Sequence, residues 1–261
     1  MSKSVPEDAN MVKVLAPFKE QVENITNVKV GKSLAYLDAA DKVCRVEECN
    51  LGNCIADSFF NYYAVRLPVE DKRKSWSQVN AAFVNGGSIR ASIDNIDDLI
   101  REDLLTTLPF GTKLLVVDVT GETLQKVFES SMTQYDRASR TAPFFQVSGM
   151  KLVYDVSQPA GNRVKSFQIL CTQCRVPQYE ALNTSLTYRI VTTEYVTYRM
   201  KDLFGNNTYT ICPPGPTDAQ AFEEYIRGKS PVTCTLERRM EFFNASTNTN
   251  EQCAPRAYIR I

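Results

Sequence analysis

The sequence predicts an α+β (mixed α/β) fold in which helices flank a mixed sheet around one main core. Its 261 residues suffice for one large domain or two small ones, at roughly 150 residues per domain. Its content of 43% hydrophobic and 23% charged residues is typical of a globular protein. Helix-type and strand-type apolar patterns alternate along the chain without an internal repeat, which favours mixed packing over an all-α or all-β fold.

The first 64 residues predict a polar tail, two helices and a short strand. Residues 1–11 are mostly polar, and we expect them to be disordered. Residues 12–24 place their apolar side chains near one helical face, and residues 35–37 suit a short strand. Asn50 is a good N-cap residue, so we expect a second amphipathic helix to begin there and to run to residue 64.

The middle of the chain predicts a buried strand followed by a helix, a second strand and a second helix. A charged loop over 67–77 precedes the apolar run at 81–84, which leads into Asn85-Gly-Gly. A Pro-Phe-Gly turn stops the short helix that follows this strand. We expect Thr120 to open the second helix. The three remaining ranges are a helix at 99–106, a strand at 113–119 and a helix at 121–133.

The C-terminal half is predicted to be richer in strands. Alternating apolar residues favour a pair of strands joined by a turn at Pro159 and Gly161. A later segment with three prolines resembles a loop. The ranges are strands at 146–156, 164–170 and 188–193, a loop at 206–216, a helix at 219–226, and an extended or helical segment at 235–243.

Histidine is absent, and this excludes several kinds of chemistry. Ser-His-Asp and Cys-His hydrolases, HExxH proteases and His-ligated zinc sites all require it. With 30 basic and 30 acidic residues, the formal net charge is zero, so we expect no nucleic-acid partner. The longest apolar runs are far shorter than the ~20 residues that span a bilayer, so we also expect no membrane insertion.

Eight cysteines and four N-x-Ser/Thr sequons together predict a secreted, extracellular protein. An even cysteine count suits disulfides, and sequons have meaning only on the secretory route. No signal-peptide core lies near the start, which we interpret as a mature chain. The candidate glycosylation sites are Asn24, Asn183, Asn206 and Asn244.

The Cys171-Thr-Gln-Cys174 motif admits three interpretations. It can be a redox thiol pair, half of a zinc site or a structural disulfide. Redox pairs usually open a helix, whereas this one follows an apolar strand, and zinc would require two more free ligands. A structural disulfide is therefore favoured.

Five motifs, in this order and spacing, carry a family resemblance. They are CRVEECNLGN at 44–53, FVNGGSIR at 83–90, LPFG at 108–111, FQVSG at 145–149 and LCTQCRVP at 170–177. Residues 12–261 thereby resemble the C-terminal domain of the 5'-nucleotidase/apyrase family. The resemblance implies a domain over 28–261 and a linker helix over 12–27. In animal members this domain also forms homodimers, so we expect a homodimer.

The resemblance implies a nucleoside site at positions that match the family. Asn-Gly-Gly after a buried strand allows the backbone to approach a ligand, and Asn85 offers a donor and an acceptor to a base. Arginine suits ribose or phosphate oxygens. The implied site residues are Arg45, Asn85, Gly87, Arg90, Phe110 and Tyr195, the two aromatics holding the base between them.

Other interpretations of these residues stay open. Asn85-Gly-Gly can be a simple turn, Phe110 can belong to the core, and Arg45 and Arg90 can form surface ion pairs. The chain also departs from the family at 197–202, where TYRMKD replaces a glycine-rich loop and Lys201 replaces a ribose-binding aspartate.

The resemblance also implies two local disulfides, one between Cys44 and Cys49 and one between Cys171 and Cys174. A third family pair is lost, because Ala56 and Ala82 occupy its positions. Three pairings are open to the remaining cysteines, Cys54, Cys212, Cys234 and Cys253.

In the family, catalysis belongs to an N-terminal domain that holds two metal ions through His, Asp and Asn. We therefore expect this chain to be non-catalytic and to need no cofactor. The resemblance extends to salivary proteins of blood-feeding insects, which implies a modulator of immune cells or haemostasis that binds a host protein or cell-surface receptor. The alternatives are sequestration of adenine nucleotides or nucleosides, and the substrate-binding half of a complete nucleotidase.

Overall fold

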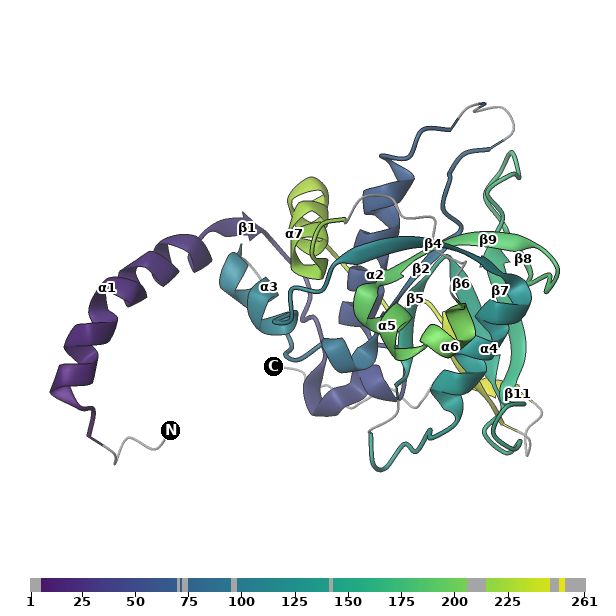
Figure 1. Ribbon diagram of the computed structural model, residues 1–261, viewed down its shortest axis with the longest axis horizontal. Coiled ribbons are helices and arrows are strands. Elements are labelled where there is room, and N and C mark those ends of the chain that lie inside the picture. Colours follow the sequence, from purple (N-terminus) through teal and green to yellow (C-terminus); the bar gives the residue numbers. More distant parts are fainter. Residues whose placement is uncertain are drawn as a thin grey trace.

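The two larger β-sheets and their helices form the body from which the N-terminal helix extends (Figure 1). The computed structural model describes residues 6–69, 71, 75–94, 98–140, 143–205, 215–244 and 249–251. Its helices are α1 (Ala9–Thr26), α2 (Asn50–Ala64), α3 (Arg101–Thr107), α4 (Gly121–Met132), α5 (Glu194–Arg199), α6 (Lys201–Phe204) and α7 (Asp218–Lys229), with short 3-10 helices η1 (Ala40–Arg45) and η2 (Gly86–Ser88).

A four-stranded mixed sheet lies at the centre. Its order is β4-β9-β2-β5, in which β2 and β9 run parallel and the other two pairs run antiparallel. Its strands are β4 (Leu114–Thr120), β9 (Thr187–Thr193), β2 (Ala81–Asn85) and β5 (Phe145–Ser148).

A five-stranded sheet of order β11-β10-β6-β7-β8 adjoins it, and a two-stranded sheet pairs β1 with β3. Only β10 and β6 run parallel in the larger of these sheets. The strands are β6 (Met150–Tyr154), β7 (Val164–Leu170), β8 (Tyr179–Ala181), β10 (Met240–Asn244), β11 (Thr249–Glu251), β1 (Lys29–Gly31) and β3 (Leu99–Ile100).

The central sheet is covered on both faces, which explains why β2 is a continuous apolar run. Ala82 and Val84 face one core with α2 and α7, whereas Ala81 and Phe83 face a second core with α4. In the second core, Phe83, Phe128 and Phe145 pack with ring centroids 4.8–5.4 Å apart. A charged side chain at any of these strand positions would be buried.

Gly149 divides one predicted strand into two. Its φ is +71°, and a Cβ there would lie 2.5 Å from the carbonyl oxygen of Asn80. The chain therefore turns at this glycine, from β5 in the four-stranded sheet to β6 in the five-stranded one. The prediction of a single strand over 146–156 is wrong, whereas the pairing of residues 150–154 with β7 across the turn is confirmed.

The N-terminal segment differs from the prediction in two places. Helix α1 begins at Ala9 rather than residue 12, because Asp8 caps it by accepting from the backbone N–H groups of Asn10 and Met11. Residues 35–37 form no strand; β1 lies at Lys29–Gly31, and Leu37 makes only an isolated bridge to Ile93.

Helix α2 has the predicted extent but a different N-cap. Cys49 is the cap residue, and its Sγ accepts from the backbone N–H of Gly52. The Asn50 side chain faces neighbouring segments instead, accepting from Asp38 N at 2.8 Å and donating to the Tyr36 carbonyl at 2.8 Å. It thus joins α2 to the segment that precedes η1.

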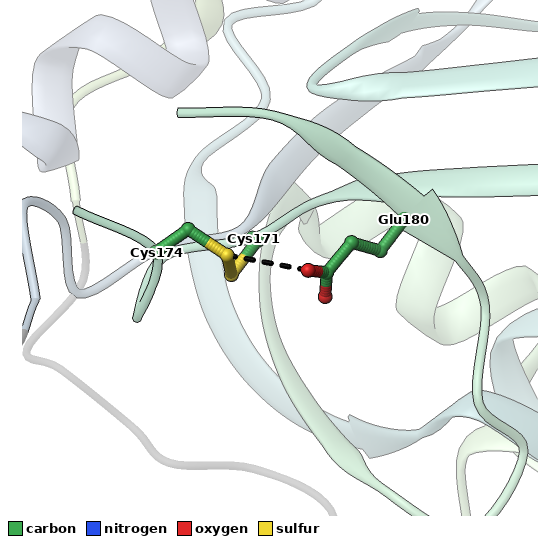
Figure 2. Close-up of side chains that lie close together, drawn as sticks. All are labelled: Cys171, Cys174 and Glu180. Atoms are coloured by element: carbon green, nitrogen blue, oxygen red, sulfur yellow. Dashed lines mark hydrogen bonds between the residues drawn. A yellow bond between two sulfur atoms is a disulfide. The ribbon is translucent and has the colours of Figure 1, made fainter. Parts of the chain in front are cut away.

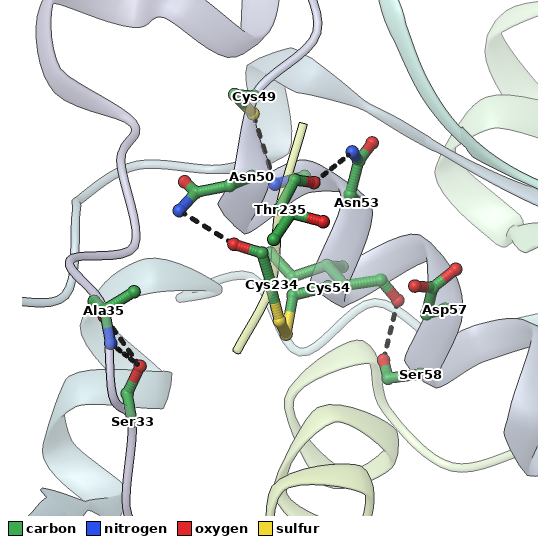
Figure 3. Close-up of a disulfide and its surroundings, with 12 residues drawn as sticks. Ser33, Ala35, Cys49, Asn50, Asn53, Cys54, Asp57, Ser58, Cys234 and Thr235 are labelled. Atoms are coloured by element: carbon green, nitrogen blue, oxygen red, sulfur yellow. Dashed lines mark hydrogen bonds between the residues drawn. A yellow bond between two sulfur atoms is a disulfide. The ribbon is translucent and has the colours of Figure 1, made fainter. Parts of the chain in front are cut away.

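The C-terminal segment crosses α2 before it enters the sheet (Figure 3). Cys234 forms a disulfide with Cys54, and Asn50 and Asn53 donate to the carbonyls of Cys234 and Thr235 at 3.2 and 2.9 Å. Strand β10 begins at Met240, so the predicted segment 235–243 forms a strand in its last part.

The three bridges in the described residues are Cys44–Cys49, Cys54–Cys234 and Cys171–Cys174. Two of them are the local bridges that the resemblance implies. The third is one of the pairings that were left open; Cys212 and Cys253 lie outside the described residues.

The strongly periodic elements are confirmed at 81–85, 101–107, 114–120, 121–132, 187–193 and 218–229. Elements β8, β11, α5 and α6 were not predicted, and β3 occupies the first two residues of the helix predicted over 99–106. Residues 1–5 and most of the expected loop 206–216 lie outside the described residues. Within the described residues, no helix has the length and apolar character that a bilayer crossing requires.

Candidate functional site

The candidate site begins where β2 ends. Asn85 Oδ1 accepts from the backbone N–H of Gly87 at 3.1 Å and shapes the turn into η2. Gly86 lies so close to η1 that a Cβ there would be 1.8 Å from the carbonyl oxygen of Cys44. The Asn-Gly-Gly segment is therefore a tight turn pressed against η1, and the amide nitrogen of Asn85 stays available to donate to a ligand.

Two guanidinium groups meet at this turn. Arg45 Nη2 and Arg90 Nη1 both donate to the carbonyl oxygen of Gly87, at 3.3 and 3.4 Å. Among the residues that the structure describes, neither arginine has a carboxylate partner, so the ion-pair interpretation is wrong there. Burial, and secondly the nearby charge of Arg90, lower the pKa of Arg45. An anion bound here would relieve the repulsion between the two charges.

Arg45 lies between two cavities. The larger, of about 310 Å³, is lined by Arg45, Asn85 and Tyr195 together with side chains of α4 and α5. The smaller, of about 240 Å³, is lined by Lys42, Arg45 and Arg90 among others. The structure thus brings three predicted residues to one cavity and places three cationic side chains around the other.

The segment that departs from the family forms helices rather than a loop. Thr193 caps α5 by accepting from the N–H of Val196, and Tyr195 stands in the first turn with 44% of its surface exposed. Arg199 and Met200 line the larger cavity. Lys201 and Asp202 are not among its described lining residues.

Phe110 is an exposed aromatic residue that follows α3. Its side chain is 62% exposed, which excludes the core interpretation, and it is not among the described lining residues of either cavity. The backbone N–H of Arg90 donates to the Thr107 carbonyl at 2.9 Å, so the segment that leads to Phe110 starts beside the arginines.

Sequence reasoning missed three residues that line the larger cavity, Ser130, Gln134 and Arg199. Ser130 lies in the last turn of α4 and Gln134 two residues beyond the end of that helix. These polar residues are a weak sequence signal for a site, because the cavity also depends on the position of α5. Arg199 lies in the segment where the resemblance fails.

A larger cavity lies elsewhere and is lined by paired charges. It measures about 620 Å³ and is lined by Asp118, Arg189 and residues near Cys171. Arg189 binds Asp118 through two bonds of 2.7 and 2.8 Å and Gln78 through a third of 3.0 Å. Because these charges satisfy one another, the electrostatic demand for a ligand is weaker than at Arg45.

Two of the four candidate glycosylation sites can be placed. Asn24 on α1 and Asn183 in the loop after β8 are exposed. Asn206 and the side chain of Asn244 lie outside the described residues. Both described sites are thus sterically open to modification.

Known proteins resemble this chain over most of its length. It is 34% identical to a snake venom 5'-nucleotidase of Naja atra over 251 residues, which is 93% of this chain and 45% of that protein. It is 31% identical to protein 5NUC of Lutzomyia longipalpis over 261 residues, or 96% of this chain and 44% of that one. The crystal structure of a 5'-nucleotidase precursor from Thermus thermophilus superposes with a TM-score of 0.77 at 27% identity, covering 92% of this chain and 44% of that one.

The chain spans less than half the length of each of these three proteins. Residues 25–204 match the family described as 5'-nucleotidase, C-terminal domain. That range contains η1, the Asn85 turn, α4 and α5, and so every described element of the candidate site. The chain therefore belongs to the 5'-nucleotidase C-terminal domain family.

Proposed function

We propose that this chain binds an adenine nucleotide or nucleoside at Arg45, with the base in the larger cavity and a phosphate toward the smaller one. The observation that carries the proposal is the meeting of Arg45 and Arg90 at the Gly87 carbonyl, without carboxylate partners among the described residues. Guanidinium groups with spare N–H donors beside open space are suited to phosphate oxygens.

The larger cavity offers contacts for a purine. The half-exposed Tyr195 ring presents a face for stacking, which contributes about 1–3 kcal/mol per base. Asn85 Nδ2 can donate to a ring nitrogen while Oδ1 holds the turn. Since Phe110 does not line this cavity, we propose stacking on one aromatic face rather than between two.

We also propose that this chain alone does not hydrolyse nucleotides. Phosphate transfer in metallophosphatases requires metal ions that activate water and neutralise the phosphoryl oxygens, and the chain has no histidine to hold them. Purified protein should release no phosphate from AMP, ADP or ATP with zinc, magnesium or calcium present. Metal-dependent turnover that persists through several purification steps would contradict this part.

Two tyrosines of the same helix provide a matched test of nucleotide binding. Tyr195 lines the cavity, whereas Tyr198 is 71% exposed and is not among the described lining residues. In calorimetric titrations with AMP, Tyr195→Ala should weaken binding by roughly 5- to 100-fold, the equivalent of lost stacking. Tyr198→Ala should bind as the unchanged protein does. Equal effects of the two variants would place the nucleotide elsewhere.

A second candidate function is that of a secreted protein that binds a host protein or cell-surface receptor and thereby modulates immune cells or haemostasis. It is supported by exposed aromatic side chains, Phe110 and Tyr198, because aromatic residues anchor protein interfaces. The venom relatives and the three disulfides support secretion. If calorimetric titration with millimolar AMP and adenosine shows no heat of binding, the result favours this second function over nucleotide binding.

A further inference from the structure

Three side chains of types that bind metals lie close together on the β7–β8 hairpin, outside the cavities at Arg45 and Arg90. Cys171 follows β7, Cys174 lies in the hairpin loop, and Glu180 is in β8 (Figure 2). Cys174 Sγ and Glu180 Oε1 are 3.3 Å apart, and the ligand atoms of all three residues lie within 4.8 Å of one another. Cys171 and Glu180 also line the cavity of about 620 Å³, so solutes can reach the cluster.

The hairpin holds these side chains in place. Glu180 pairs with Ile169 across the β-ladder, and the N–H of Cys171 donates to the Gln178 carbonyl at 2.9 Å. Gln178 Nε2 donates to Glu180 Oε1 at 3.1 Å and so orients the carboxylate toward the sulfur. The three ligands therefore need little rearrangement to converge on one point.

The oxidised and reduced forms of the pair differ in what they offer Glu180. A disulfide sulfur carries no hydrogen, so the carboxylate oxygen beside Cys174 receives no hydrogen bond from it. Reduction would create a thiol donor or a thiolate at this distance. In a tetrahedral zinc site the S–O and S–S separations are about 3.6 and 3.8 Å, values that follow from Zn–S and Zn–O bonds of about 2.3 and 2.1 Å.

Accessibility favours reduction of this bridge over the other two. Both cysteines of this bridge are half-buried beside the large cavity, whereas Cys44, Cys49 and Cys54 have at most 2% of their surfaces exposed. In the other two described bridges, only Cys234, the partner of Cys54, is half-buried. A thiolate must attack a disulfide sulfur directly, so exposed bridges exchange first. A mild reductant should therefore open Cys171–Cys174 selectively.

We propose that Cys171, Cys174 and Glu180 form a site for Zn²⁺ or another thiophilic divalent cation once the bridge is reduced by a dithiol. The dithiol supplies two electrons and two protons and becomes a disulfide itself, while the S–S bond breaks and two S–H groups form. The cation then displaces both protons, binds two thiolates and one carboxylate oxygen, and takes water as a fourth ligand. This site is separate from the nucleoside cavity and does not depend on the proposed function.

The test uses Cd²⁺ as a zinc analogue and the chain's single tryptophan as a local reporter. The indole Nε1 of Trp76 donates to the Cys171 carbonyl at 2.8 Å, and its backbone N–H donates to the Thr172 carbonyl. Among the six cysteines that the structure describes, protein treated briefly with a phosphine reductant and desalted without oxygen should show alkylation at Cys171 and Cys174 only. Added Cd²⁺ should then bind one to one, with thiolate charge-transfer absorption and a change in Trp76 emission.

Three variants distinguish Cd²⁺ binding at this site from adventitious binding of Cd²⁺ to thiols. Glu180→Gln should raise the Cd²⁺ dissociation constant at least ~10-fold, whereas Glu20→Gln on exposed α1 should leave it unchanged. Cys174→Ser should abolish tight one-to-one binding, and circular dichroism shows whether each variant is folded. The proposal is overturned if the reduced protein binds Cd²⁺ no better than the oxidised one, if Glu180→Gln matches the unchanged protein, or if another bridge is reduced first.

Discussion

Arg239 is a buried cation whose bonds join three segments of the chain. It binds Asp57 on α2 through two bonds of 2.8 Å, Glu237 at 2.9 Å and the Val147 carbonyl at 2.7 Å. The Asp57 and Glu237 carboxylates more than offset the effect of burial and raise the pKa of Arg239. Buried charges of this kind are stable only while their partners are present.

Removing this guanidinium should therefore be costly. We expect Arg239→Ala to lower the free energy of unfolding by about 3–5 kcal/mol, because Asp57 would be left without its partner. The neighbouring Arg238 is exposed and pairs with Glu241, so Arg238→Ala should cost no more than about 1 kcal/mol. Urea denaturation of the oxidised proteins measures both. A loss no larger in Arg239→Ala than in Arg238→Ala would refute this role.

Asp218 makes stability depend on pH. Burial raises the pKa of its carboxyl from 3.8 to about 6, although Oδ1 accepts from the N–H of Ala219. The folded state therefore holds this proton more tightly than the unfolded state. Its contribution is complete below about pH 4 and is lost as the pH rises through 6.

The amide variant isolates this titration. Relative to the unchanged protein, Asp218→Asn should gain stability between about pH 4 and pH 7, by an amount on the order of 3 kcal/mol at most, at ~1.4 kcal/mol per pKa unit. The measurement is the difference in Tm between the two proteins at several pH values and constant ionic strength. A difference that does not change with pH would show that Asp218 does not titrate in this range.

At the scale of elements, helices and strands were predicted correctly where a single hydrophobic pattern runs through the whole segment. The apolar run of β2, the strand β4 and the capped helix α4 each carry an unambiguous local signal. Prediction failed where tertiary contacts decide. Cys49 rather than Asn50 caps α2, because Asn50 Oδ1, the atom that could cap the helix, accepts instead from the backbone N–H of Asp38, which is twelve residues away in sequence.

The candidate site shows the same limit. Asn85, Arg45 and Tyr195 could be proposed from motifs, and the structure does place them around one cavity. That Arg199 takes part follows from the position of α5, whose residues line the same cavity as Ser130 of α4. No local pattern in the sequence carries that information.

The turn at Gly149 offers a test at this scale. Alanine there would require φ near +71° and would bring Cβ within 2.5 Å of a carbonyl oxygen, so Gly149→Ala should destabilise by about 1–3 kcal/mol. Gly228 lies within α7, and a Cβ added there would meet no described atom within 4 Å, so Gly228→Ala should instead stabilise by up to ~1 kcal/mol. Thermal unfolding distinguishes the two signs, and a neutral Gly149→Ala would contradict the account of this junction.

At the scale of the whole molecule, α1 is the least covered element. It extends from the body (Figure 1), and none of its residues is buried. Met11, Leu15, Phe18, Val22 and Ile25 follow alternating spacings of four and three and are each 54–59% exposed. Such spacing is typical of helices that pair with another helix.

We therefore propose that the expected homodimer uses α1. Light scattering should give twice the 29.4 kDa of one chain, and Leu15→Glu with Phe18→Glu should reduce the mass to that of one chain. Lys19→Glu, on the same helix but outside this apolar row, is the control. A dimer that survives the double substitution would have to use another surface, and a single-chain mass in the unchanged protein would refute the dimer.

Calorimetry with AMP and adenosine tests most directly whether Arg45 and Arg90, which have no carboxylate partner among the described residues, hold the phosphate of a nucleotide. AMP should bind with a dissociation constant in the tens of micromolar, or about 6 kcal/mol, and adenosine should bind more weakly. Arg45→Gln should reduce the affinity for AMP to that for adenosine, whereas Arg66→Gln, at an arginine paired with Glu224, should not. Equal binding of AMP and adenosine, or no heat at millimolar AMP, would contradict the claim.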